Sequence, residues 1–206
     1  MELTEQAIEE NYTRFIDLLK NNVKREGINT LIQWLNAKDT KTAPASTRFH
    51  MSCRGGLVKH CLNVYDRLKR LMATEYSESC PYSEETLTIV ALLHDISKIN
   101  FYEVSYRNTK DDNGNWIKVP FYQVKEDKDR LIFGSHSMNS YYMVSKFLKL
   151  NYEEELAILH HMGGTDPSED TITIKNVYTA FERSTLATLL HVADVMATVI
   201  DEVEVE

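Results

Sequence analysis

Apolar residues recur every three to four positions over several stretches of the chain, which is the spacing of an amphipathic helix. In the first stretch, residues 5–20, they are Ala7, Ile8, Tyr12, Phe15, Ile16, Leu18 and Leu19. The same spacing predicts further helices over 30–36, 55–71, 135–150, 152–162 and 180–199. Residues 38–52 hold Pro44 and several Thr and Ser residues, and they predict a loop.

One helix is predicted to lie at the centre of the core. Ser83 is followed by Glu84 and Glu85, which is the pattern of an N-cap with acidic residues in the first turn. The residues that follow, 87–93, are apolar on almost every side of a helix. Such a helix has no face for solvent and must be covered by other helices.

A different pattern occupies residues 101–124, where Tyr, Val, Phe, Trp and Ile flank Asn113-Gly114. This dipeptide favours a type I′ turn, so we expect a β-hairpin inserted between helices. The predicted fold class is therefore all-α, a helical bundle with one inserted β-hairpin. Without repeats or linkers, residues 1–206 are expected to form a single domain, with N-terminal helices in 1–37 and a catalytic core in 50–200.

Composition and net charge limit the kinds of molecule that the protein is expected to bind. The chain has 206 residues, 43% of them hydrophobic, and a formal net charge of −8. This charge disfavours long nucleic acid and fits a small phosphorylated substrate whose charge a metal neutralises. No apolar run approaches the roughly 20 residues that cross a bilayer, and no secretion signal is evident, so we expect a cytoplasmic protein without a membrane partner. The cysteines lack CxxC spacing and are expected to be reduced. These patterns do not predict an oligomeric state.

Histidine and aspartate residues supply the candidate chemistry. His94-Asp95 directly follows the central helix, where a carboxylate is costly unless it is paired or bound to a cation. His60 is on a neighbouring predicted helix, and Asp194 is inside another apolar helix. Two imidazoles and two carboxylates from three core helices predict a divalent metal site. Mixed nitrogen and oxygen ligands suit Mn, Fe, Co, Ni or Zn and suit Ca poorly.

The order H…HD…D resembles the HD phosphohydrolase superfamily. Residues 55–60 (GGLVKH) look like its first-ligand motif, residues 92–98 (LLHDISK) like its second, and residues 190–194 (LHVAD) like its last. Ser97 stands where the family usually has glycine, which leaves the ligands intact but questions how the helix ends. The ribbon and flanking motifs look closest to small phage-type HD hydrolases.

Two further segments suggest a second metal ion: residues 133–136 (FGSH) begin one predicted helix, and residues 159–164 (LHHMGG) end another. The order H…HD…H…HH…D is similar to binuclear members such as HD-GYP phosphodiesterases and HD-domain 3′-to-5′ exoribonucleases, although the GYP tripeptide is absent. This resemblance implies that Asp95 bridges two ions, with His136 and His161 on the second. His160 is either a further ligand or a supporting residue, because neighbours on a helix point about 100° apart.

The resemblance implies an enzyme that cleaves a phosphomonoester or phosphodiester of a small nucleotide or short oligonucleotide through a metal-activated hydroxide. Besides Asp95, the expected catalytic residues are Lys98 and Arg54, which would hold phosphate oxygens unless they form surface ion pairs instead. The alternatives are a di-iron oxygenase of the same fold and a catalytically idle nucleotide-binding module. A complete ligand set disfavours the idle module.

Several residues carry weaker expectations. Tyr106 and Trp116 would border the pocket and stack a nucleobase, unless they only pack the ribbon. His50 is expected at the pocket rim or as a plain loop residue, and His191 as a core histidine or a substrate contact. The acidic end of the chain, residues 201–206, is expected to be solvated and without a specific role.

Overall fold

The structure is a computed structural model that describes residues 2–77, 79–132, 135–164 and 171–203. Within these residues the helices are α1 (Glu5–Asn22), α2 (Ile28–Asn36), α3 (Gly56–Tyr76), α4 (Glu84–Leu93), α5 (His136–Ser145), α6 (Tyr152–His160), α7 (Thr171–Arg183) and α8 (Thr185–Met196). Two antiparallel strands, β1 (Tyr102–Lys110) and β2 (Trp116–Val124), form a ribbon. The predicted fold class, all-α with an inserted hairpin, is confirmed.

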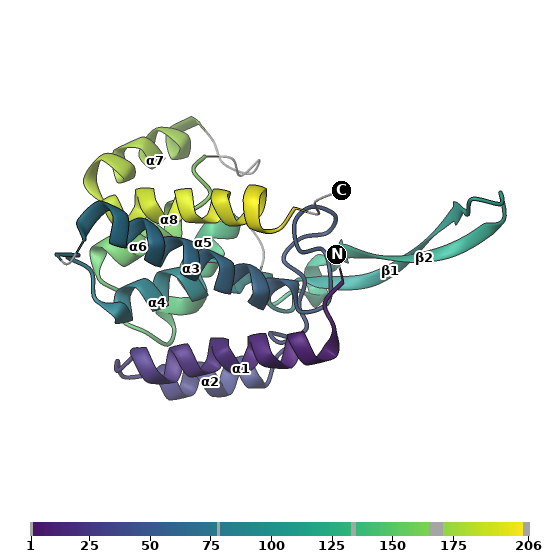
Figure 1. Ribbon diagram of the computed structural model, residues 1–206, viewed down its shortest axis with the longest axis horizontal. Coiled ribbons are helices and arrows are strands. Elements are labelled where there is room, and N and C mark those ends of the chain that lie inside the picture. The colour runs from purple at the N-terminus through teal and green to yellow at the C-terminus, as the bar shows by residue number, and fades with distance from the viewer. Residues whose placement is uncertain (1, 78, 133–134, 165–170, 204–206) are drawn as a thin grey trace.

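Helix α4 is the centre of the core, as its apolar sequence predicts. Every side chain from Thr86 to Leu93 is buried. The Ser83 side chain accepts a hydrogen bond from the backbone N–H of Thr86 (3.1 Å), so the predicted N-cap is confirmed. Helices α1, α3 and α6 pack against α4. In Figure 1, α1 and α2 line one side of the body, α7 and α8 line the other, and α3 and α4 lie between them.

The helix predicted over 180–199 is in fact interrupted. Helix α7 ends at Arg183 and α8 begins at Thr185, because the Ser184 side chain caps α8 by accepting from the N–H of Ala187 (3.2 Å). The pair 175–183 and 185–201 is bent by 115°. Apolar spacing does not reveal this break, since serine occurs both within helices and at their caps. No single helix in the described part of the chain is long and apolar enough to cross a membrane; only this bent pair passes that test, by length and composition alone.

The hairpin has the predicted strands but a different turn. The N–H of Gly114 donates to the Asp111 carbonyl (2.9 Å), which centres the turn on Asp112 and Asn113. Of these residues only Gly114 has a positive φ (81°), whereas a type I′ turn needs positive φ at both central positions. The predicted type I′ turn is therefore wrong. The Asp111 carboxylate explains the alternative, since it accepts from the N–H groups of Asn113 and Asn115 (2.9 and 2.8 Å).

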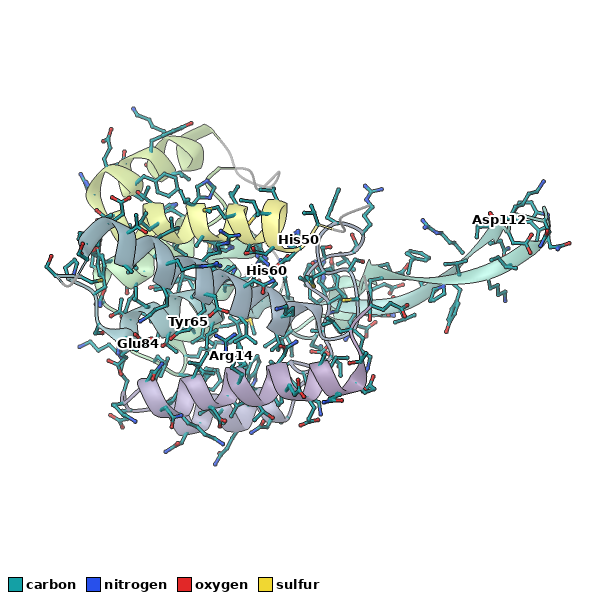
Figure 2. All side chains as sticks on the ribbon, in the orientation of Figure 1. Arg14, His50, His60, Tyr65, Glu84 and Asp112 are labelled. Carbon is teal, nitrogen blue, oxygen red and sulfur yellow. The ribbon has the colours of Figure 1, made fainter. Side chains whose placement is uncertain are left out.

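The ribbon projects away from the helical body, as Figure 1 shows. In Figure 2, Asp112 marks its tip, far from His60 in the body. Trp116 pairs with Lys110 next to this tip and is 70% exposed, and Tyr106 is 65% exposed. The expectation that these aromatic side chains border the pocket is therefore wrong for Trp116, and Tyr106 lies open to solvent.

A buried ion pair ties the segment after α1 to α4 and α6. The Glu154 side chain is fully buried, and Arg25 donates to both of its carboxylate oxygens (2.6 and 2.7 Å). The Thr86 hydroxyl donates to the same carboxylate (2.9 Å), as does the N–H of Asn151 (2.9 Å). Arg25 and Thr86 come from other segments, whereas Asn151 is the N-cap of α6 itself, so the carboxylate joins α6 to α4 and to the segment after α1.

We expect Arg25→Ala to lower the free energy of unfolding by about 3–5 kcal/mol, because it leaves the Glu154 carboxylate buried without its cation. Arg14 is the matched control, since it also binds a carboxylate with two nitrogens but its pair with Asp66 is 46% and 42% exposed. Arg14→Ala should cost less than about 1 kcal/mol. Urea unfolding of both variants measures the difference, and equal losses would contradict the assignment.

Candidate metal centre

The centre is built around Asp95, which follows α4 at the start of the turn Ile96–Lys98 and is 2% exposed. Its two carboxylate oxygens face different groups. Oδ2 lies 2.6 Å from Nζ of Lys98, 3.5 Å from Nε2 of His60 and 3.7 Å from Nε2 of His94. Oδ1 contacts Nε2 of His136 and lies 3.4 Å from Nε2 of His161.

Five helix segments meet at this carboxylate. His60 comes from α3, His94 and Asp95 follow α4, His136 begins α5, His161 follows α6, and Asp194 comes from α8. Nε2 of His60 lies 3.1 Å from Oδ1 of Asp194. Among the described residues, ligand atoms within 4.8 Å of one another form four groups. Three contain Asp95 or Asp194, namely His60–His94–Asp95, His94–His161–Asp194 and Asp95–His136–His161, and the fourth is His50–His60–Glu202. The structure thus brings together six of the predicted metal ligands.

The outer nitrogen of each of the four histidines is held by another group. Nδ1 of His94 donates to the Ala91 carbonyl and Nδ1 of His161 to the Ile158 carbonyl, both at 2.8 Å. A carbonyl only accepts, so Nδ1 carries the proton and Nε2 keeps its lone pair in the neutral ring. Nδ1 of His60 donates to Glu202 (3.0 Å), and Nδ1 of His136 lies 3.0 Å from the Ser97 hydroxyl. All four Nε2 atoms therefore face the cluster, which is the arrangement of metal-binding histidines.

The surroundings of two of these inner nitrogens show whether a metal ion fits the site. Nε2 of His94 and Nε2 of His161 are buried, and neither has a hydrogen-bond partner in the described part of the chain. A buried polar atom without a partner costs about 1–3 kcal/mol. A divalent cation would use both lone pairs, and the mixture of imidazole and carboxylate donors suits a transition metal. The residues present fit such an ion.

The protonation states of His94 and Asp95 suit metal binding. Burial lowers the pKa of His94 to about 4, which keeps the ring neutral. Burial opposes the charge on Asp95, yet Lys98 and His136 hold its pKa well below the usual range. For His60 the hydrogen bonds to Asp194 and Glu202 outweigh burial and raise the pKa to about 10, and Asp95 outweighs burial and raises the pKa of His161, so a metal ion would displace a proton from these two rings. Ionised carboxylates and neutral imidazoles are the forms that bind metals.

Three other predicted site residues have different outcomes. Lys98 lies at the cluster, and its side chain is 12% exposed. Arg54 is 48% exposed and pairs with Glu5 on α1 (2.6 Å). The expected phosphate contact is therefore wrong for Arg54, and its alternative, a surface ion pair, applies. His160 has no atom in the ligand groups, and its Nδ1 is buried without a partner among the described residues.

The structure adds residues that the sequence analysis missed. The end of the chain was expected to be solvated, yet the Glu202 side chain is fully buried against His60, and Asp201 pairs with Arg67 (2.7 Å). Residues 204–206 lie outside the described part. The apolar spacing of the last predicted helix stops before Glu202, so no local signal places it at the site.

Two more histidines lie next to the cluster. The ring of His50 is 5.0 Å from that of His60, and Figure 2 shows the two side by side. Nδ1 of His191 donates to the His161 carbonyl (2.7 Å), and its ring stacks on Phe181. His191 is half-buried, and its hydrogen bond supports the segment that carries His161.

Comparison with known families agrees with this geometry. The model of the HD domain matches residues 57–199, a range that contains all six clustered residues. The chain belongs to the HD domain family. Neither the curated proteins nor the solved structures gave a match. The HD domain places the chain in a superfamily of metal-dependent phosphohydrolases, and the buried His and Asp cluster is consistent with a metal site. The resemblance to phage-type HD hydrolases stays a prediction.

His160 and His161 allow a matched test of the HD domain centre. We expect His161→Ala to weaken Mn²⁺ binding by at least about tenfold, because it removes a nitrogen that faces Asp95. His160→Ala should leave the affinity within about twofold, since its nitrogens lie outside the ligand groups. Titration of the metal-free proteins with Mn²⁺ gives both values. Equal losses of Mn²⁺ affinity, or a larger loss in His160→Ala, would show that the assignment of His161 as the ligand is wrong.

Proposed function

We propose that this HD domain protein hydrolyses a phosphomonoester or phosphodiester bond of a small nucleotide or short oligonucleotide. One observation carries the proposal: a buried, ionised Asp95 is surrounded by four imidazole Nε2 atoms, two of which have no partner in the described part of the chain. Such a set has no structural use without a cation, which argues against an idle module.

The two faces of Asp95 support a binuclear centre. Oδ2 is on the side of His60 and His94, whereas Oδ1 is on the side of His136 and His161. A carboxylate that bridges two ions less than about 4 Å apart has this arrangement. In such a centre the loss of His161 lowers the number of bound Mn²⁺ ions from two to one, so the titration above also bears on this point.

The side chains at the edge of the cluster indicate how substrate approaches. His94 and His161 are completely buried, but the side chains of His136, Asp194 and Lys98 are 21%, 15% and 12% exposed. Bound divalent ions would supply a water with a lowered pKa and positive charge for phosphate oxygens. Lys98 binds Asp95 with one N–H and has two further donors, which suit a phosphate oxygen at this open edge.

The main experiment is a hydrolysis panel of nucleotides and short oligonucleotides with Mn, Fe, Co, Ni, Zn or Mg. We expect at least one substrate to be cleaved, and we expect Asp95→Asn to lower kcat/KM by at least about 100-fold because the amide removes a charged ligand. Asp66→Asn, a change in an exposed carboxylate, is the control.

An oxygen-uptake assay on protein loaded anaerobically with iron tests the di-iron oxygenase alternative. Oxygen consumption with no hydrolysis in the panel would replace the phosphohydrolase by the oxygenase. Full turnover in Asp95→Asn would show that the site takes no part in the reaction.

Lys98 and Arg54 separate substrate contact from general surface charge. We expect Lys98→Met to raise KM by about tenfold, equivalent to about 1.4 kcal/mol of binding, with the Mn²⁺ content unchanged. Arg54→Met removes an equal charge from an exposed pair with Glu5 and should leave KM unaltered. Steady-state kinetics on the cleaved substrate measures both. An unchanged KM in Lys98→Met would show that this lysine binds Asp95 and does not contact the substrate.

A further inference from the structure

Glu202 is a buried carboxylate close to the end of the chain. It follows the π-helical turn Ala197–Asp201, which continues α8. Its side chain has no exposure to solvent, although four of the last six residues of the sequence are acidic and would favour water. Burial of a carboxylate is costly without compensating donors, so its contacts define what it does.

Among the described residues, the side-chain hydrogen bonds of Glu202 go to α3, and His50 lies within 4.8 Å of the same carboxylate. Oε1 accepts from Nδ1 of His60 (3.0 Å) and from Nδ2 of Asn63 (2.9 Å), and Oε2 lies 3.2 Å from the same His60 nitrogen. His60, Asn63 and Arg67 follow one another at helical spacing and share a face of α3. Arg67 binds the neighbouring Asp201 through Nε (2.7 Å). The end of the chain is thus attached to the same face of α3 that presents His60.

We propose that Glu202 is a positioning residue of the metal centre, whose carboxylate holds the Nδ1–H of His60 so that Nε2 faces Asp95 and Asp194. This inference rests on the metal-dependent function proposed above. Without an acceptor at Nδ1, the imidazole of His60 is free to rotate about its Cβ–Cγ bond and to carry its proton on either nitrogen. Both changes take the Nε2 lone pair away from the cluster.

His60 differs from the other clustered histidines in the kind of group that holds it. His94 and His161 donate to backbone carbonyls and His136 lies against a hydroxyl, whereas His60 donates to a carboxylate. A carboxylate partner fixes the tautomer and also increases the basicity of the ligating nitrogen. His60 is on the Oδ2 side of Asp95, so this effect concerns the ion on that side.

The π-helical turn explains how Glu202 reaches α3. The N–H of Glu202 donates to the Ala197 carbonyl, five residues earlier (3.1 Å). An α-helical continuation has one residue fewer in that turn, which rotates the following side chain by about 100°. The wide turn therefore determines which residue faces His60. Glu202 also lies beyond residues 57–199, the range that the HD domain model matches, so the contact belongs to this chain's own C-terminal segment.

The test compares Glu202→Ala and Glu202→Gln with Asp201→Asn. We expect Glu202→Ala to weaken Mn²⁺ binding by about 10–100-fold, the usual effect of losing a hydrogen-bond partner of a metal-binding histidine. Glu202→Gln should lose several-fold less, because its amide oxygen still accepts from His60. Asp201→Asn removes a neighbouring carboxylate charge without touching His60, and its affinity should stay within about twofold. Titration of each metal-free protein with Mn²⁺ alone gives these values.

A second readout separates positioning from a general loss of stability. In protein with ¹⁵N-labelled histidine and bound Zn²⁺, we expect the His60 Nδ1–H proton to exchange slowly with solvent in the wild type. In Glu202→Ala the exchange should be faster by at least about tenfold, and in Asp201→Asn it should be unchanged. NMR spectra of the three proteins provide this comparison.

Wild-type Mn²⁺ affinity together with slow exchange at His60 in Glu202→Ala would overturn the proposal. If that variant does not fold, the Glu202→Gln protein decides, and unchanged affinity and exchange in it overturn the proposal equally. Neither measurement uses a substrate. A wild type that binds Mn²⁺ but hydrolyses nothing would therefore refute the proposed function and leave the assignment of Glu202 standing.

Discussion

The burial of Asp95 is the constraint on which the rest of the centre depends. Helix α4 is buried on all sides, so the residues that follow it enter the interior, and the Asp95 carboxylate is only 2% exposed. An ionised carboxylate at this depth needs positive charge and donors around it. Lys98 supplies one positive charge from the next turn, whereas Asp95, Asp194 and Glu202 are three buried or largely buried carboxylates. A divalent cation balances this excess of negative charge, which is why the architecture and the metal belong together.

Helix ends provide the local means of presenting the ligands. The last turn of a helix has carbonyl groups without an intrahelical partner. In α4 and α6 one such carbonyl, that of Ala91 or Ile158, accepts the Nδ1–H of the histidine three residues later. The same hydrogen bond therefore caps the helix and directs Nε2 outward from its end. Because both helices end at the same place, two imidazoles converge there with their tautomers already fixed.

The remaining supports are particular to this chain. Ser97 stands where the resemblance to the HD family leads us to expect glycine, and its hydroxyl lies 3.0 Å from Nδ1 of His136, so the serine provides a partner for a clustered histidine. The outer part of the ribbon leaves the body and exposes Trp116 near its tip, whereas Tyr102 at its root lies close enough to Lys98 and Asp95 for their charges to affect its pKa. The centre thus depends on the helices and on the C-terminal turn, and the outer part of the ribbon stands apart from it.

Local spacing and short motifs predict most of the helices, the central place of α4 and the six residues that form the cluster. The sequence by itself did not determine whether His160 joins His161 as a ligand, since only the packing of α6 against α5 and α8 orients the end of that helix. Nor did it place Arg54 against Glu5 or break the last helix at Ser184. The contact between His60 and Glu202 joins residues 142 positions apart. Such a contact depends on how α8 lies along α3 and on one wide turn, and no local pattern encodes either, so the tertiary structure alone decided it.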